Sequence, residues 1–187
     1  MADPKGRAIL ISVHLGNIVK QSDCDGIVNS ANRNLRAGSG VCGAIHRAAG
    51  PELEEFSHKL APLETGDAVA TPGFRLGNRV IIHTKGPKYH FDPEPAKYLA
   101  MAIRNALLVA DSEQVSRLAV PAISMGVYAY PPEEAVPILV QAALDTGKEL
   151  QCVEEIRFVV IDEFLLRLFD AQISQLNPTQ AEPGHGN

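Results

Sequence analysis

Short apolar runs along the chain predict β-strands. They cover residues 8–13, 26–29, 67–71, 79–84, 118–123 and 156–161. The first of them, AILISV, is too apolar to lie exposed on both faces of a sheet. We therefore expect strands that are covered by other elements.

Helical patterns and helix-start signals separate most of these runs. In the longer segments apolar residues recur every three or four positions, which predicts amphipathic helices. Helices are expected at 41–49, 51–60, 96–110, 133–148 and 163–176. Strands and helices alternate, except for one adjacent strand pair within residues 67–84. This order predicts an α/β fold, a three-layer α/β/α sandwich with a mixed, mostly parallel central sheet.

The stretch from Ile27 to Gly50 joins a strand end, an amide-rich loop, a glycine turn and a helix. Asn29 and Asn32 follow the apolar pair at 27–28, and Gly38-Ser39-Gly40 precedes the helix. Glycine lets the main chain approach a ligand closely, and the first turn of a helix offers N–H groups without a partner in the helix. Together these features favour an anion, most often a phosphate.

Residues 38–43 also match the pattern G-x-G-x-x-G, but their context excludes a nicotinamide site. That site needs its first glycine directly after the first strand and an acid at the end of the second strand. Here a polar loop separates strand and glycines, and Asp67 stands at the start of an apolar run.

Three stretches of this chain match a known pattern. VNSAN at 28–32 and GSGVCGAIHRAAG at 38–50 are similar to VNAAN, spacer, GGGVxGAIHRAAG, and PAISMGVYAYP at 121–131 is similar to PAISTGVYGYP. Through these patterns the chain resembles the macrodomain family, whose members bind ADP-ribose. The likeness runs from about Gly16 to Phe169 and is nearest to bacterial O-acetyl-ADP-ribose deacetylases and mono-ADP-ribosyl hydrolases. It implies a macrodomain-like fold.

The resemblance also implies which residues contact the ligand. Asn17 replaces the usual acid that accepts the adenine amino group, and Ile161 replaces an aromatic residue beside the adenine. The two glycine turns would grip the diphosphate, and Asn32 and Tyr128 would lie against the distal ribose. Asn32, Gly40 and Tyr128 form the expected catalytic set. The expected ligand-binding residues are Asn17, Ile18, Ala31, Asn32, Gly38, Ser39, Gly40, Val41, Ser124, Met125, Gly126, Val127, Tyr128 and Ile161.

Several of these residues have simpler interpretations that stay open. By its type alone Asn17 is a turn residue, and Asn29 is a buried amide that ties neighbouring loops together. His83 lies within the apolar run VIIH and is interpreted as a hydrogen-bonded core residue. Ser124 lacks the G-x-S-x-G context of a nucleophile and is assigned to the second phosphate-binding turn.

Cys42 stands where many relatives have an aspartate that orients a water molecule. Three interpretations remain. The thiol is a small apolar group that fills the helix start, or it is a nucleophile activated by the helix dipole, although no His is placed to pair with it. In the third, Cys42 is inert and the substrate's own phosphate activates the water while Asn32 and Gly40 hold the ribose.

The expected function is ADP-ribose binding with slow hydrolysis of esters at the distal ribose. The esters are O-acetyl-ADP-ribose or mono-ADP-ribose on acidic side chains. The alternatives are a non-catalytic reader of ADP-ribose and a phosphatase acting on ADP-ribose 1″-phosphate. We expect ADP-ribose or its derivatives, including ADP-ribosylated proteins, as partners, and no cofactor or metal.

Bulk properties agree with one globular domain at 1–176, followed by a polar tail at 177–187 that we expect to be disordered. The net charge of −5 argues against direct binding of nucleic acid or of an anionic membrane. No apolar run approaches a membrane span, and the start of the chain does not resemble a signal peptide. The 3 cysteines form no metal or disulfide pattern. A cytoplasmic location is the default expectation.

Overall fold

A six-stranded sheet organises the computed structural model, which describes residues 8–177. Its order is β1-β6-β5-β2-β4-β3, and all neighbours run parallel except β3, which is antiparallel to β4. The prediction of a mixed, mostly parallel sheet is confirmed. The strands are β1 Leu10–Leu15, β2 Gly26–Ser30, β3 Ala68–Pro72, β4 Val80–Thr84, β5 Arg117–Pro121 and β6 Glu155–Val160.

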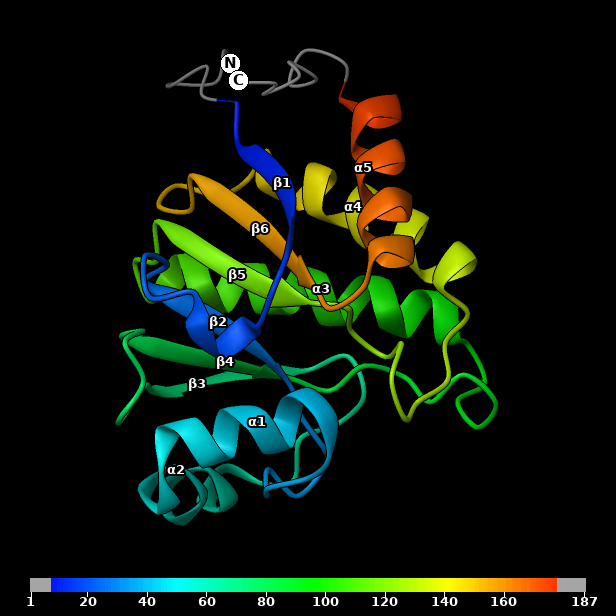
Figure 1. The fold of residues 1–187 in the computed structure, drawn as a ribbon. Helices are drawn as coiled ribbons and strands as arrows, with labels where there is room; N and C mark the ends of the chain where they lie inside the picture. The colour runs from blue at the N-terminus through cyan, green and yellow to red at the C-terminus, as the bar shows by residue number, and fades with distance from the viewer. Residues whose placement is uncertain (1–7, 178–187) are drawn as a thin grey trace.

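Helices cover both faces of this sheet, as the alternating pattern predicted. On one face lie α3, α4 and α5, and on the other lie α1 and α2 (Figure 1). The helices are α1 Gly40–Ala49, α2 Pro51–Ser57, α3 Pro95–Ser112, α4 Pro132–Gly147 and α5 Glu163–Leu176. Short 3₁₀ turns, η1 Ile18–Lys20 and η2 His58–Leu60, complete the set.

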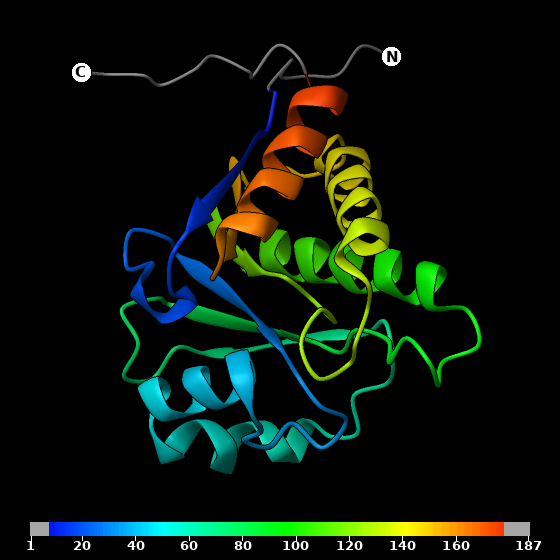
Figure 2. The same cartoon turned by 45° about the vertical axis from the view of Figure 1, so that its right-hand side comes forward.

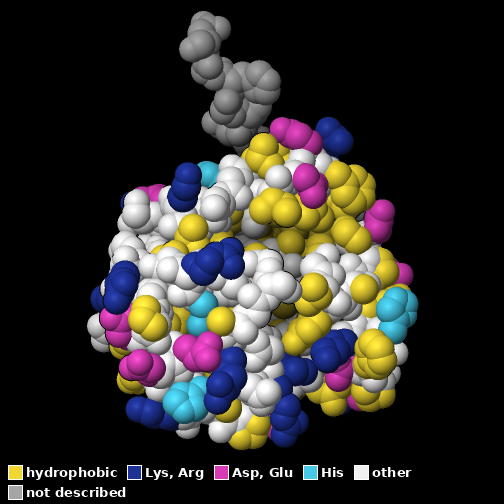
Figure 3. Space-filling model, turned by 60° about the horizontal axis from the view of Figure 1, so that its bottom comes forward, with side chains coloured by type: hydrophobic (Ala, Val, Ile, Leu, Met, Phe, Trp, Pro, Cys, Tyr) yellow, Lys and Arg dark blue, Asp and Glu magenta, His cyan; other side chains and the backbone are white. Residues whose placement is uncertain are grey.

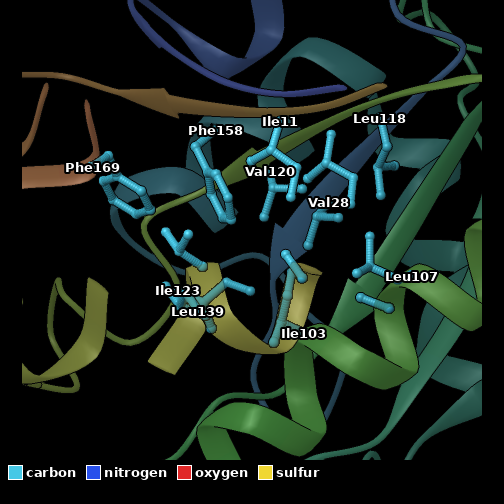
Figure 4. Close-up of a cluster of buried hydrophobic side chains, with 14 of the residues drawn as sticks. Ile11, Val28, Ile103, Leu107, Leu118, Val120, Ile123, Leu139, Phe158 and Phe169 are labelled. Atoms are coloured by element: carbon cyan, nitrogen blue, oxygen red, sulfur yellow. The ribbon is translucent and has the colours of Figure 1, made fainter. Parts of the chain in front are cut away.

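Two apolar cores form because successive residues of a strand point to opposite faces. Ile27 of β2 packs in the core under α1, together with Ile45 and Ala49. The next residue, Val28, packs in the larger core on the other face, with Ile103 of α3. Figure 4 shows that larger core between the strands and α3 and α4. The near-continuous apolar runs therefore reflect strands that are buried on both faces.

The structure shifts some predicted boundaries. The first strand begins at Leu10 and extends to Leu15, because it pairs along the whole of β6, Leu10 opposite Glu155 and Leu15 opposite Val160. The fifth strand ends at Pro121, because the Ile123 N–H donates to the Pro121 carbonyl at 2.9 Å as the chain turns. The segment predicted as one helix at 51–60 ends in the η2 turn. The expected tail lies outside the described residues except for Asn177, and the domain boundary stays a prediction.

Candidate functional site

A cleft of about 220 Å³ opens at the carboxyl ends of the two central strands, β2 and β5. The loops that follow these strands leave the sheet on the same side (Figure 2) and form the two walls. Segments that are about ninety positions apart in the sequence thus meet because β2 pairs with β5, Gly26 opposite Leu118. The lining residues are Ser30, Asn32, Gly38, Ser39, Gly40, Val41, Cys42, Ala122, Ser124, Gly126, Val127 and Tyr128.

The first wall is the start of α1 and the glycine turn before it. Gly40 has φ +56°, which side chains other than glycine rarely adopt, and a Cβ there would meet no atom within 4 Å. Its conformation, and not lack of space, therefore requires glycine. The first N–H that is bonded within the helix is that of Gly43, which donates to the Ser39 carbonyl at 3.2 Å. The N–H groups of Gly40 and Val41 consequently have no partner among the described residues.

The second wall is the turn after β5. The N–H of Met125 donates to the Ala122 carbonyl at 3.3 Å, and that of Tyr130 donates to the Ser124 carbonyl at 2.9 Å. Between these bonds, the N–H groups of Gly126 and Val127 have no partner within residues 8–177. Ser124 has φ +65°, so the turn is held in a conformation that costs free energy for a serine. Such strain is typical of functional turns.

The lining of the cleft has little charge of its own. Among these residues, all of which lie in the described part of the chain, there is no Asp, Glu, His, Lys or Arg. On the face shown in Figure 3, hydrophobic side chains gather in one area, and both acidic and basic side chains lie around it. Main-chain N–H dipoles are therefore the principal attraction for an anion in the cleft.

The thiol of Cys42 and the phenol of Tyr128 are the two titratable groups of the lining. Burial raises the pKa of Cys42, although hydrogen bonds from the Asn29 side chain and from the main chain of Gly38 and Asn32 oppose that change. The thiol also donates to the Arg36 carbonyl at 3.4 Å. Burial likewise raises the pKa of Tyr128. Cys42 is therefore a protonated thiol at neutral pH, which disfavours the interpretation as an activated nucleophile.

Asn32 and Tyr128 both line the cleft, and their contact with the distal ribose stays a prediction. The Oδ1 of Asn32 accepts from the N–H groups of Asn34 and Arg36, each at 3.2 Å, and its Nδ2 donates to the Arg36 carbonyl at 2.7 Å. One amide hydrogen of Asn32 remains for a ligand. The centre of the Tyr128 ring lies 5.5 Å from the Lys88 ammonium. The main-chain carbonyl of Tyr128 accepts from the Tyr89 N–H at 3.0 Å.

A chain of buried side chains lies behind Cys42. Asn29 Nδ2 lies 3.7 Å from Cys42 Sγ and 3.0 Å from His83 Nδ1, and His83 Nε2 lies 2.9 Å from Thr71 Oγ1. Because the Thr71 hydroxyl donates to the Pro72 carbonyl at 3.2 Å, His83 carries its hydrogen on Nε2 and accepts from Asn29 through Nδ1. Burial lowers the pKa of His83 to about 3, so the ring is neutral.

These contacts match the simpler interpretations of two residues. His83 is a hydrogen-bonded core residue, and Asn29 is a buried amide that connects β4 to the start of α1. The sequence did not predict that one chain of contacts joins them to Cys42 and Thr71. Nothing in the spacing of these four residues indicates that they meet.

Five expected ligand-binding residues do not line the cleft, and their contact with a ligand stays a prediction. They are Asn17, Ile18, Ala31, Met125 and Ile161. The Asn17 side chain caps η1 by accepting from the Val19 N–H at 3.1 Å, as a turn residue does. Ile161 is 80% exposed after β6, and the Gly16 N–H donates to the Val160 carbonyl at 2.8 Å. Asn17 and Ile161 therefore lie near each other, at the carboxyl ends of β1 and β6.

Two lining residues were not predicted. Ser30 is the last residue of β2, and Ala122 directly follows β5. The rule that ligands bind outside the carboxyl ends of parallel strands was the available signal for both.

Within residues 8–177 no helix is long and apolar enough to cross a membrane. Across the same range no group of at least three His, Cys, Asp or Glu residues could hold a metal ion.

Comparisons with known proteins agree on one family. The family model described as Macro domain matches residues 28–139. A macro domain-containing protein of Ralstonia nicotianae is 43% identical over 153 residues, which are 81% of this chain and 88% of that protein. An O-acetyl-ADP-ribose deacetylase of Salmonella newport is 39% identical over 162 residues, or 84% of this chain and 90% of the relative. The solved structure of the Oceanobacillus iheyensis macrodomain with ADP has a TM-score of 0.84 and 34% identity, covering 89% of this chain and 91% of that one.

Proposed function

This chain belongs to the Macro domain family, and we propose that it binds ADP-ribose in the cleft and slowly hydrolyses esters at the distal ribose. The substrates in this proposal are O-acetyl-ADP-ribose or mono-ADP-ribose on acidic side chains. The observation that carries the proposal is the pair of facing turns, residues 38–41 and 124–128, which line one cleft with main-chain N–H groups that have no partner in the described chain.

The geometry of the two turns suits a diphosphate. Each phosphoryl group has several acceptor oxygens, and N–H groups from opposite walls can bond to it without any cationic side chain. The acidic net charge of the protein does not oppose this, because salt screens distant surface charges over about 8–10 Å, whereas the main-chain N–H groups contact the anion directly. The relatives described above, one named for O-acetyl-ADP-ribose and one solved with ADP, support the same class of ligand.

The proposed reaction is ester hydrolysis. Water adds to the carbonyl carbon of the ester, the bond to the ribose oxygen breaks, and ADP-ribose and the carboxylic acid leave. No carboxylate of the described chain lines the cleft, and Cys42 is protonated. A phosphate oxygen of the substrate therefore accepts the proton of the attacking water, while Asn32, Gly40 and Tyr128 hold the ribose. Slow turnover follows, since such an oxygen is a weak base at neutral pH.

Calorimetry and a turnover assay test the proposal. We expect ADP-ribose to bind more tightly than ADP or NAD, and O-acetyl-ADP-ribose to be converted to ADP-ribose, as followed by chromatography. Asn32→Ala should abolish turnover. Asn34→Ala is the matched control, since Asn34 is an exposed amide in the same loop that does not line the cleft. Absence of ADP-ribose binding by the wild-type protein would refute the proposal.

A non-catalytic reader is the second candidate, and one observation favours it. The cleft holds a buried thiol where many relatives have a carboxylate, so binding does not require that turnover follows. The non-catalytic reader would be favoured if the protein binds ADP-ribose tightly but, at high protein concentration, releases no acetate from O-acetyl-ADP-ribose over hours.

A further inference from the structure

Each wall of the cleft rests on a glycine that does not itself line the cleft. The first is Gly43, in the first turns of α1. A Cβ on Gly43 would lie 2.3 Å from the Gly38 carbonyl oxygen and 3.0 Å from Arg47 Nη1, whereas ordinary contacts begin at 3.4 Å. The Gly38 carbonyl thus lies directly against the helix main chain. A side chain at position 43 would have to displace the turn at 38–41 by about 1 Å.

The second is Gly86, in the loop after β4. A Cβ on Gly86 would lie 2.1 Å from Ser124 Oγ and 2.7 Å from Ile123 Cγ2. Ile123 is fully buried, and Ser124 is only 5% exposed, so neither can withdraw into solvent. The Ser124 hydroxyl has no hydrogen-bond partner among the described residues and can rotate, but Ile123 Cγ2 is packed in the core. A side chain at position 86 would therefore displace the turn at 123–124.

We propose that Gly43 and Gly86 are positioning residues that set the width of the cleft. Each lets one wall approach a neighbouring element at a distance that no other residue allows, and so the two rows of N–H groups face each other at the spacing of a diphosphate. This inference rests on the proposed function. An N–H···O bond spans about 2.7–3.2 Å, so a wall displaced by about 1 Å cannot keep its bonds to a ligand held by the other wall.

Alanine substitutions test this, with a control in which the new Cβ meets its neighbour at a still shorter distance. In Gly73→Ala the new Cβ would lie 1.8 Å from the Asn78 carbonyl oxygen. Gly73 follows β3 in the turn that leads to the start of β4, at the end of that strand remote from the cleft. Thermal unfolding should show that Gly43→Ala, Gly86→Ala and Gly73→Ala all lower the Tm. Calorimetry with ADP-ribose should show an increase in Kd of about tenfold or more for the first two and no change for Gly73→Ala.

A double variant separates displacement of the wall from general damage. Gly86→Ala/Ser124→Gly removes the Ser124 hydroxyl and Cβ, which the new methyl group meets, and leaves the contact with Ile123 Cγ2; glycine also suits φ +65°. The double variant should bind ADP-ribose more tightly than Gly86→Ala alone. If Gly43→Ala does not fold, this pair decides the proposal.

Four outcomes would overturn the inference. Folded Gly43→Ala and Gly86→Ala proteins with the Kd of the wild type would remove it while leaving the proposed function intact. The same would follow if Gly73→Ala weakened binding as much as they do, or if the double variant bound no better than Gly86→Ala. A wild-type protein that binds no ADP-ribose would remove the proposed function and this inference together.

Discussion

Mild acid should destabilise the fold through His83, which lies buried in β4 between Asn29 and Thr71. Burial lowers the pKa of His83 from 6.5 to about 3, with a smaller contribution from His46. In the unfolded chain the same imidazole takes up a proton below about pH 6.5. Between pH 6.5 and 3 the unfolded state thus binds one proton more than the folded state. The stabilisation is fully present above pH 6.5 and is lost progressively as the pH falls towards 3.

The size of the effect follows from this difference in proton binding. Each pH unit below the unfolded pKa costs about 1.4 kcal/mol, so lowering the pH from 7.5 to 5.5 should reduce the free energy of unfolding by about 1.3 kcal/mol through His83 alone. Burial also lowers the pKa of His46 and His14, which adds to the loss in the same direction. The contribution of His83 must therefore be taken as a difference between variants.

Urea unfolding at pH 7.5, 6.5 and 5.5 measures this difference. His83→Gln removes the titrating ring, and its loss of stability over the range should be about 1.3 kcal/mol smaller than that of the wild type. Thr71→Val is the control. It removes one partner of His83 but leaves the ring buried, so it should lower stability at every pH and keep the wild-type dependence. If the free energy of unfolding of His83→Gln falls with pH as much as that of the wild type, the argument is refuted.

Two further predictions concern Cys42 and the segment after α4. Cys42→Asp should raise the rate of O-acetyl-ADP-ribose hydrolysis about tenfold or more, because a carboxylate in the first turn of α1 supplies the missing base. An unchanged rate would contradict that mechanism, while Cys42→Ala should keep the wild-type rate, since a protonated thiol performs no step. Asp111 accepts the N–H groups of residues 151–153 at 2.7–3.1 Å. Asp111→Ala should therefore cost about 2 kcal/mol in urea unfolding with no change in ADP-ribose affinity, and a cost below about 0.5 kcal/mol would show that water replaces the carboxylate.

Much of the fold was predictable from the sequence because the pattern is local. Strands buried on both faces need apolar residues at consecutive positions, as in VIIH at 80–83, and α5 was predicted with its observed limits. The glycine turn before α1 was also predicted, since Gly40 and the helix start are adjacent in sequence. Boundaries were less certain, because the end of β1 depends on its pairing with β6, which the residues of β1 alone do not reveal.

The candidate site, too, was predictable only in part. Residues 38–41 and 124–128 by themselves predict the type of each wall, a glycine-containing turn after a strand. Which walls face each other depends on the strand order, in which β5 and β2 are neighbours although about ninety residues separate them. That order also brings Asn29, His83 and Thr71 into one buried chain behind Cys42, and places Asn17 and Ile161 at the ends of other strands.

The sequence by itself thus determined the elements, their alternation and the chemistry of each turn, because these depend on residues within a few positions of one another. Only the tertiary structure decided the width of the cleft, the neutral state of His83 and the protonation of Cys42. The width depends on how closely Gly86 lets the distant turn at 123–124 approach, and the two protonation states depend on how completely distant segments exclude water. Neither quantity is a property of a local pattern.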